Sequence, residues 1–172
     1  MKMRILILGS LVLLAFNQLK AQDDFPTAPP SPLDHEFLSF LVGEWEGSTE
    51  SIMGTSTDWS KYEMALGGQF LMMQGTYDFG GMKYEGRGYL TINDEGGMAA
   101  AWIDNFRGRY AGSGTIEDNK ITVNWEGNGR KSTRVTEKSG NDEITIISKD
   151  ETPQGTMESK SVYTRKTTMG KK

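Results

Sequence analysis

The short spacing of turn signals from residue 43 onward constrains the fold most. Runs of about seven to twelve residues, rich in Thr, Tyr, Trp, Ile and Val, alternate with clusters of Gly, Asn and Asp. Such runs favour β-strands, and such clusters favour hairpin turns. We expect strands near residues 43–53, 57–66, 69–77, 82–92, 98–105, 108–116, 120–126, 131–137, 142–149 and 156–166.

The links between these strands are too short to hold a crossover helix. A parallel pair needs a connection of a dozen residues or more, so consecutive strands must be antiparallel. A meander of about ten strands either closes into a barrel or folds into a sandwich, and closure removes the exposed edges. Glycines inside the runs, such as Gly86 and Gly88, suit strongly coiled strands. We predict an all-β fold, an antiparallel up-and-down barrel with one short N-terminal helix.

That helix is expected just before the first strand. Ser31, Pro32 and Asp34 match a capping box with proline in the first turn. The apolar positions that follow at helical spacing are Leu33, Phe37, Phe40 and Leu41. His35 lies beside this stripe, where a single histidine is expected to pack or to cap the helix rather than to act in catalysis.

The first 21 residues have the pattern of an export signal. Lys2 and Arg4 precede an apolar run from Ile5 to Phe16, and the small residue Ala21 follows. A run of about twelve residues is shorter than the roughly twenty that span a membrane. We therefore expect a periplasmic or secreted protein without a stable membrane anchor.

The domain boundaries follow from this signal and from the prolines behind it. Residues 1–21 are expected to form a signal peptide, and residues 22–31, which contain most of the prolines, a Pro-rich linker. Residues 32–168 then form a single lipocalin-like β-barrel domain, a size that one hydrophobic core can support.

Composition excludes several kinds of chemistry. The chain has no cysteine and one histidine, so it cannot form a cysteine zinc site, a disulfide framework or a multi-histidine metal cluster. Removal of Lys2, Arg4 and Lys20 with the signal leaves 16 of the 19 basic residues against 23 acidic ones, a net charge of about −7. We expect no metal and no nucleic-acid partner, and the sequence leaves the oligomeric state open.

Four motifs carry a resemblance to known proteins. A short helix followed by Gly43-Glu44-Trp45 resembles the Gly-x-Trp opening of lipocalin-like (calycin) barrels. Together with Leu66-Gly67-Gly68, Trp102-Ile103-Asp104 and the closing Tyr163-Thr164-Arg165-Lys166, it resembles domain of unknown function 1579, an exported bacterial family. The resemblance spans nearly the whole mature chain, and it implies a calycin barrel without an assigned activity.

The resemblance also implies roles for particular residues. In calycin barrels an arginine of the last strand lies over the Gly-x-Trp ring, which makes Trp45 and Arg165 a structural closure pair. Nitrobindin-like barrels are more distantly similar and hold haem through a histidine late in the chain. This sequence has no histidine after His35, so we expect no haem and no other cofactor.

Strand alternation assigns candidate ligand-binding residues to the lumen. One expected face carries Ser60, Tyr62, Met64 and Leu66. Across the strands, the candidates are Tyr62, Met64, Tyr84, Trp102, Asp104, Arg134, Met157 and Tyr163. The lumen should be lined by aromatic and Met side chains, with gaps at Gly86 and Gly88. Asp104 and Arg134 would either orient a ligand head group or form an ion pair at the rim.

Three hypotheses for function remain open at this point. The first is a non-enzymatic barrel that binds a hydrophobic small molecule, either apolar or amphipathic. The second is a barrel enzyme, an isomerase or hydrolase that uses Asp104 and a lumen tyrosine such as Tyr84 as acid and base. The third is a protein-interaction scaffold with a filled core. No catalytic motif is identified, and Gly112-Ser113-Gly114 lacks the context of a nucleophile elbow.

Overall fold

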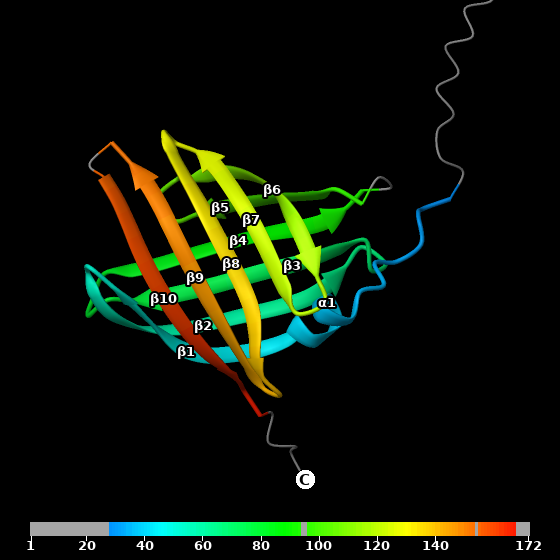
Figure 1. Ribbon diagram of the computed structural model, residues 1–172, viewed down its shortest axis with the longest axis horizontal. Helices are drawn as coiled ribbons and strands as arrows, with labels where there is room; N and C mark the ends of the chain where they lie inside the picture. Colours follow the sequence, from blue (N-terminus) through cyan, green and yellow to red (C-terminus); the bar gives the residue numbers. More distant parts are fainter. Residues whose placement is uncertain (1–27, 94–95, 154, 168–172) are drawn as a thin grey trace, which may run out of the picture.

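The computed structural model describes residues 28–93, 96–153 and 155–167 of the 172-residue chain. Ten strands form one closed barrel in the ring order β1-β10-β9-β8-β7-β6-β5-β4-β3-β2 (Figure 1). The elements are α1 (Glu36–Leu41), β1 (Gly43–Ser51), β2 (Gly54–Ala65), β3 (Phe70–Asp78), β4 (Lys83–Ile92), β5 (Met98–Asp104), β6 (Arg109–Glu117), β7 (Lys120–Gly127), β8 (Arg130–Gly140), β9 (Glu143–Thr152) and β10 (Gly155–Arg165). The predicted all-β barrel with one short helix is confirmed.

Every pair of consecutive strands is antiparallel, as the short turns require. The ring closes where β1 pairs with β10, with Trp45 opposite Arg165 in the register. On its other side Trp45 lies opposite Ser60 of β2. Buried and exposed residues alternate along most strands, so each strand presents one face to the lumen and one to solvent.

The helix begins later than the capping-box pattern predicts. α1 starts at Glu36, and the His35 side chain caps it by accepting a hydrogen bond from the Phe37 backbone N–H through Nδ1 at 3.2 Å. The expected start at Ser31 is wrong because the chain before His35 is held by the turn between β2 and β3. There the Leu33 N–H donates to the carbonyl oxygen of Gly68 at 2.9 Å. The capping role of His35 is confirmed.

The hydrophobic core lies at the end of the barrel that α1 covers, which we call the helix end. It consists of Phe37, Leu38, Leu41, Trp45, Leu71, Leu90, Met98, Ala100, Ile121, Val123, Ile144, Ile146 and Tyr163. We call the opposite end the mouth, formed by the turns β1–β2, β3–β4, β5–β6, β7–β8 and β9–β10. The two ends thus differ in how far the chain fills the lumen.

The expected signal peptide and the first part of the expected linker, through residue 27, lie outside the described residues. The end of that linker is bound to the barrel, because the Gln69 side chain donates a hydrogen bond to the Pro30 carbonyl oxygen at 2.7 Å. Across the described ranges, no helix is long and apolar enough to cross a membrane.

Candidate functional site

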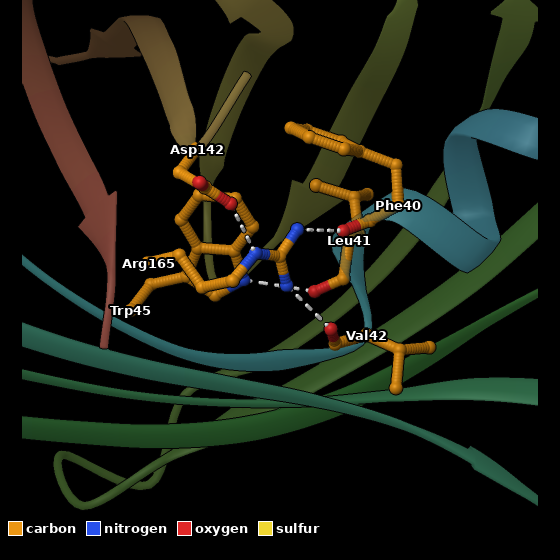
Figure 2. A network of polar contacts seen from close by, with 6 residues as sticks. All are labelled: Phe40, Leu41, Val42, Trp45, Asp142 and Arg165. Atoms are coloured by element: carbon orange, nitrogen blue, oxygen red, sulfur yellow. Dashed lines mark hydrogen bonds and ion pairs between the residues drawn. The ribbon is translucent and has the colours of Figure 1, made fainter. Parts of the chain in front are cut away.

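The helix end is closed by the Arg165 guanidinium, which uses all three of its nitrogens. Nε donates to the Asp142 carboxylate at 3.0 Å, Nη1 to the carbonyl oxygen of Val42 at 2.7 Å and Nη2 to that of Phe40 at 2.6 Å (Figure 2). The guanidinium carbon lies 4.3 Å from the centre of the Trp45 ring. This contact is the one that the Gly-x-Trp resemblance implies.

The Trp45 side chain is held in place by a hydrogen bond to α1 and by complete burial. Its indole N–H donates to the Leu41 carbonyl oxygen at 2.8 Å, and its side chain is fully buried (Figure 2). Arg165 therefore satisfies carbonyl groups at the C-terminal end of α1, which would otherwise lack partners. The contacts of this pair are with the chain itself, so its role is structural.

Toward the mouth, lumen-facing side chains become polar or aromatic and remain partly exposed. They are Tyr77, Tyr84, Trp102, Trp125, Ser132, Arg134, Ser148, Asp150, Met157 and Ser159, which we call the mouth half of the lumen. Met157 is its single methionine, so this surface is lined mainly by rings and polar groups rather than by thioethers.

The expected gaps at Gly86 and Gly88 are occupied by the Trp102 side chain. A Cβ atom added at Gly86 would lie 2.3 Å from Trp102 Cζ2, and one at Gly88 would lie 2.7 Å from its Cε3. Both glycines face the lumen as predicted, but the indole ring lies directly over them. The expectation of open space at these positions is wrong, because a flat ring fills what the missing side chains leave free.

Asp104 belongs to a turn and not to an ion pair. Its Oδ1 accepts hydrogen bonds from the backbone N–H groups of Phe106 at 2.9 Å and Gly108 at 2.7 Å. Its Oδ2 accepts from the Tyr84 hydroxyl at 3.3 Å. The structure thus brings Asp104 and Tyr84 together, whereas no ion pair among the described residues joins Asp104 to Arg134.

Tyr84 is held as a neutral phenol. Burial raises its pKa, and so does the charge of Asp104, although the Trp102 indole N–H, which donates to its hydroxyl at 2.6 Å, works in the opposite direction. A tyrosine with a raised pKa is a poor proton acceptor near neutral pH. The geometry that would support acid and base catalysis is present, but the protonation of Tyr84 opposes its use as the base.

Arg134 crosses the lumen. Its Nη2 donates to the Tyr77 hydroxyl at 2.7 Å, from β8 to β3. These strands are five positions apart in both directions around the ring, so the bond joins opposite walls of the barrel. The Nε of Arg134 is buried and has no hydrogen-bond partner. The guanidinium is therefore a cation in the lumen with most of its donors unused.

A buried carboxyl group, Asp58, was not predicted from the sequence. It is 3% exposed and accepts hydrogen bonds from Thr49 at 2.5 Å, Ser56 at 2.5 Å and Tyr163 at 3.1 Å. The Thr49 hydroxyl also contacts the Ser161 hydroxyl at 2.6 Å. This cluster fills the lumen between β1, β2 and β10 without apolar side chains.

The alternation that identified Tyr62 would have found Asp58 if it had been followed back to the start of the expected strand, 57–66, which already includes this residue. The strand begins at Gly54, and the pattern that includes Ser60 and Tyr62 continues back to Ser56 and Asp58. At its other end the expected pattern is wrong. Leu66 lies in the turn with a positive φ of 51° and is 76% exposed.

The remaining candidates lie closer to the core. Tyr62 and Met64 pack against the apolar cluster at the helix end, and Tyr163 belongs to it. Burial raises the pKa of Tyr62 to about 12. Tyr62, Met64 and Tyr163 therefore line the inner boundary of the mouth half, while Tyr84, Trp102, Arg134 and Met157 line the mouth half itself.

The rim of the mouth carries exposed apolar side chains. They are Ile52 and Met53 in the β1–β2 turn, Met82 before β4 and Phe106 in the β5–β6 turn. Phe106 is 61% exposed, and its ring stacks on Tyr84 with centroids 6.2 Å apart. Apolar contacts are thus available from the rim into the lumen.

A second concave surface lies outside the barrel. A groove of about 470 Å³ crosses the outer face of β6 to β9. Its charged side chains are Glu126, Lys131, Lys149 and Glu151, which carry both signs. Solvated charges of opposite sign give little net field, so this groove is a weaker candidate than the lumen.

Comparisons with known proteins agree with this architecture. A family model described as "Protein of unknown function (DUF1579)" matches residues 31–168. No curated protein matches the sequence. The family resemblance inferred from the sequence motifs is confirmed.

Several solved structures are similar to the barrel. S-type phycobiliprotein lyase CPES from Guillardia theta has 13% identity and a TM-score of 0.59, covering 77% of this chain and 92% of that chain. Rv2717c from M. tuberculosis has 13% identity and a TM-score of 0.56, covering 76% and 95%. EF1p2_mFAP2b, solved bound to DFHBI, has 8% identity and a TM-score of 0.51, covering 76% and 97%. At these identities the likeness shows the fold alone.

Proposed function

The chain belongs to the DUF1579 family, whose description states no function, and we propose that its barrel binds an amphipathic small molecule in the mouth half of the lumen. The observation that supports this most is the partial exposure of lumen-facing Tyr, Trp and Arg side chains beside a fully packed helix end. Ligand sites combine apolar and aromatic surface with a few polar groups, and the mouth half has this composition.

Binding without chemistry is the form of this function that we favour. The Asp104 carboxylate already accepts two backbone N–H groups, and Tyr84 remains protonated because burial raises its pKa. Tyr84 is therefore poorly suited to accept a proton from a substrate near neutral pH. The solved barrel bound to DFHBI supports the proposal to the extent that a similar fold holds a small molecule.

We further propose that the barrel acts outside the cytoplasm, in the periplasm or as a secreted protein. The support is the sequence pattern of Lys2, Arg4, an apolar run from Ile5 to Phe16 and the small residue Ala21 that follows. N-terminal sequencing of the mature protein should begin at Gln22. A full-length chain that retains Met1 would contradict the proposal.

The binding proposal is tested by titration with a neutral fluorescent probe, dansyl-6-aminohexanamide. We expect saturable binding at roughly micromolar dissociation constants. Ser132→Phe projects a ring into the lumen and should weaken binding by roughly tenfold or more. Thr133→Phe, one residue away on the same strand, faces outward into the external groove and should leave binding unchanged.

The outcomes distinguish the two surfaces. Loss of binding in Thr133→Phe but not in Ser132→Phe would place the site in the external groove and contradict the proposal. Absence of binding to folded wild-type protein, both of this amide and of a charged form of the same probe, would favour a filled barrel. Native mass spectrometry of protein purified from its own host would then show whether a natural ligand copurifies.

A further inference from the structure

We propose that the ligand carries a carboxylate, and that Arg134 and Tyr77 bind this group inside the barrel. The inference rests on the ligand binding proposed above, and it identifies the chemical class of the ligand. It starts from a cation in the lumen for which the chain itself supplies no counter-ion.

The partners of Arg134 leave its charge uncompensated. Of its five N–H groups, one donates to an uncharged tyrosine hydroxyl at 2.7 Å, and the buried Nε has no partner. No ion pair to a carboxylate is found for Arg134 within the described residues. Arginine remains charged at all physiological pH values, so loss of a proton cannot relieve the free-energy cost of this uncompensated charge.

Two of the carboxyl groups in the lumen, Asp58 and Asp104, already accept hydrogen bonds from other donors, and the third, Asp150, forms no ion pair with Arg134. Asp58 accepts three hydroxyl groups, from Thr49, Ser56 and Tyr163. Asp104 accepts two backbone N–H groups and the Tyr84 hydroxyl. An anion that enters from the mouth would therefore meet Arg134 without competing with an existing salt bridge.

A carboxylate fits the donors that remain. A guanidinium presents a planar fork to which the two oxygens of a carboxylate can bind, and such charge-assisted hydrogen bonds are stronger than neutral ones. The Tyr77 oxygen accepts from Arg134, which leaves its own O–H free to donate to an oxygen of the ligand. Arg134 and Tyr77 together would thus hold one oxyanion from opposite walls of the barrel.

The charge of the surroundings favours a monoanion over a dianion. Arg134 is the basic residue inside the mouth half and Arg130 lies at its rim, whereas Asp150 faces the same lumen and Asp104 also lies at the rim. A phosphate would bring a second negative charge toward these carboxylates. The rings of Tyr84 and Trp102 would contact the apolar body of the ligand, which extends toward Phe106.

Matched probes test the proposed carboxylate site. Dansyl-6-aminohexanoic acid and its primary amide differ in the terminal group, and a phosphate monoester on the same linker supplies the dianion. We expect the acid to bind wild-type protein roughly tenfold more tightly than the amide, since hydrogen bonds to charged groups contribute most to discrimination. The phosphate should bind more weakly than the acid.

Variants of Arg134 should remove this preference selectively. Arg134→Met should reduce affinity for the acid roughly tenfold, to that of the amide, and change the amide by less than about twofold. Arg134→Lys keeps the charge without the fork and should restore part of the preference. Tyr77→Phe, a second variant that removes a single oxygen, should weaken the acid a few-fold and spare the amide. Lys131→Met, at an exposed position near the mouth on the same strand where the side chain faces outward, is the matched control and should have little effect.

Each result has a distinct meaning. Equal affinity of acid and amide for wild-type protein, with Ser132→Phe blocking both, would overturn the carboxylate site and leave lumen binding intact. An equal loss in Lys131→Met and Arg134→Met would show general surface attraction and also overturn it. Tighter binding of the phosphate would replace the carboxylate by a dianion. Failure of all three probes to bind folded protein would instead contradict the proposed function itself.

Discussion

Two arginines face opposite ends of this barrel, and their surroundings differ. Arg165 at the helix end donates from all three nitrogens, lies over the Trp45 ring and pairs with Asp142. Arg134 in the lumen donates once, to Tyr77, and its Nε is buried without a partner. The same side chain thus has a hydrogen bond at every nitrogen and a carboxylate partner in one region and, within the described ranges, neither of these in the other.

This difference indicates where the chain is organised for stability and where for binding. A charge that is desolvated without compensation destabilises a fold unless something else supplies the missing partner. Closure at the helix end needs nothing from outside the chain. The mouth half has a cation without an ion-pair partner among the described residues and partly exposed aromatic rings, an arrangement that a ligand would complete.

Truncation of Trp45 should have the largest effect on stability, because it removes the ring on which Arg165 stacks. Trp45→Ala should lower the free energy of unfolding by about 3 to 5 kcal/mol, as for other buried large aromatic side chains. Chemical denaturation measures this. A double-mutant cycle with Arg165→Ala should give a coupling of about 0.5 kcal/mol or more.

Additive losses in that cycle would mean that the stacking of Arg165 on Trp45 contributes no free energy. The closure would then depend on the hydrogen bonds to Phe40, Val42 and Asp142 alone. A loss below about 1 kcal/mol in Trp45→Ala would contradict the assignment of the helix end as the stabilising region.

Denaturation at alkaline pH should test whether water is excluded from Tyr62, which lies at the boundary between the two regions. Burial raises the pKa of Tyr62 from about 10 to about 12, so the unfolded chain loses this proton first. The contribution of Tyr62 to the free energy of unfolding is fully present below pH 10 and is lost as the pH rises through 12. A difference of two pKa units corresponds to about 2 to 3 kcal/mol in the free energy of unfolding.

Denaturation midpoints between pH 8 and pH 12 give this dependence. Tyr62→Phe has no phenol to ionise, so its stability should decline less steeply over the same range. An identical decline in both proteins would mean that water reaches the Tyr62 hydroxyl, and that the boundary lies deeper in the barrel.

Much of the fold could be predicted from the sequence, because hairpin turns act locally. Turn residues at short intervals require antiparallel neighbours, and this alone leads to ten strands in a meander. The helix start could not be predicted in the same way. Ser31 has the correct local pattern, but the hydrogen bond from Leu33 to Gly68 joins segments far apart in the sequence and prevents an earlier start.

The site was predicted less completely, for a related reason. Period-two alternation places Tyr84, Trp102 and Arg134 in one lumen, but it does not say which side chains meet across it. The bond from Arg134 to Tyr77 and the cluster around Asp58 join different walls of the barrel. The space at Gly86 could not be predicted either, since it depends on the rotamer of Trp102 on the neighbouring strand.

A methyl group at Gly86 should disturb the mouth half with a smaller effect than the Trp45 truncation. The new Cβ atom would lie 2.3 Å from Trp102, so the ring must move or the strand must shift. Gly86→Ala should cost about 1 to 3 kcal/mol, as overpacking usually does. Arg87→Ala, which faces solvent on the same strand, is the matched control and should change stability by less than about 0.5 kcal/mol. Trp102 fluorescence would show the displacement, and equal effects of the two variants would contradict the position of the ring.

The smallest expected change comes from the arginine in the lumen. Arg134→Met removes a charge without a carboxylate partner and keeps an apolar side chain of similar length, so we expect a change within about 1 kcal/mol, neutral or stabilising. Arg165→Met leaves the carbonyl groups of Phe40 and Val42 without their donors and should cost about 1.5 to 3 kcal/mol. Denaturation of the two variants under the same conditions compares the regions directly. If Arg134→Met were as destabilising as Arg165→Met, Arg134 would be part of the structural core, and the distinction between a stabilising helix end and a binding mouth would no longer hold.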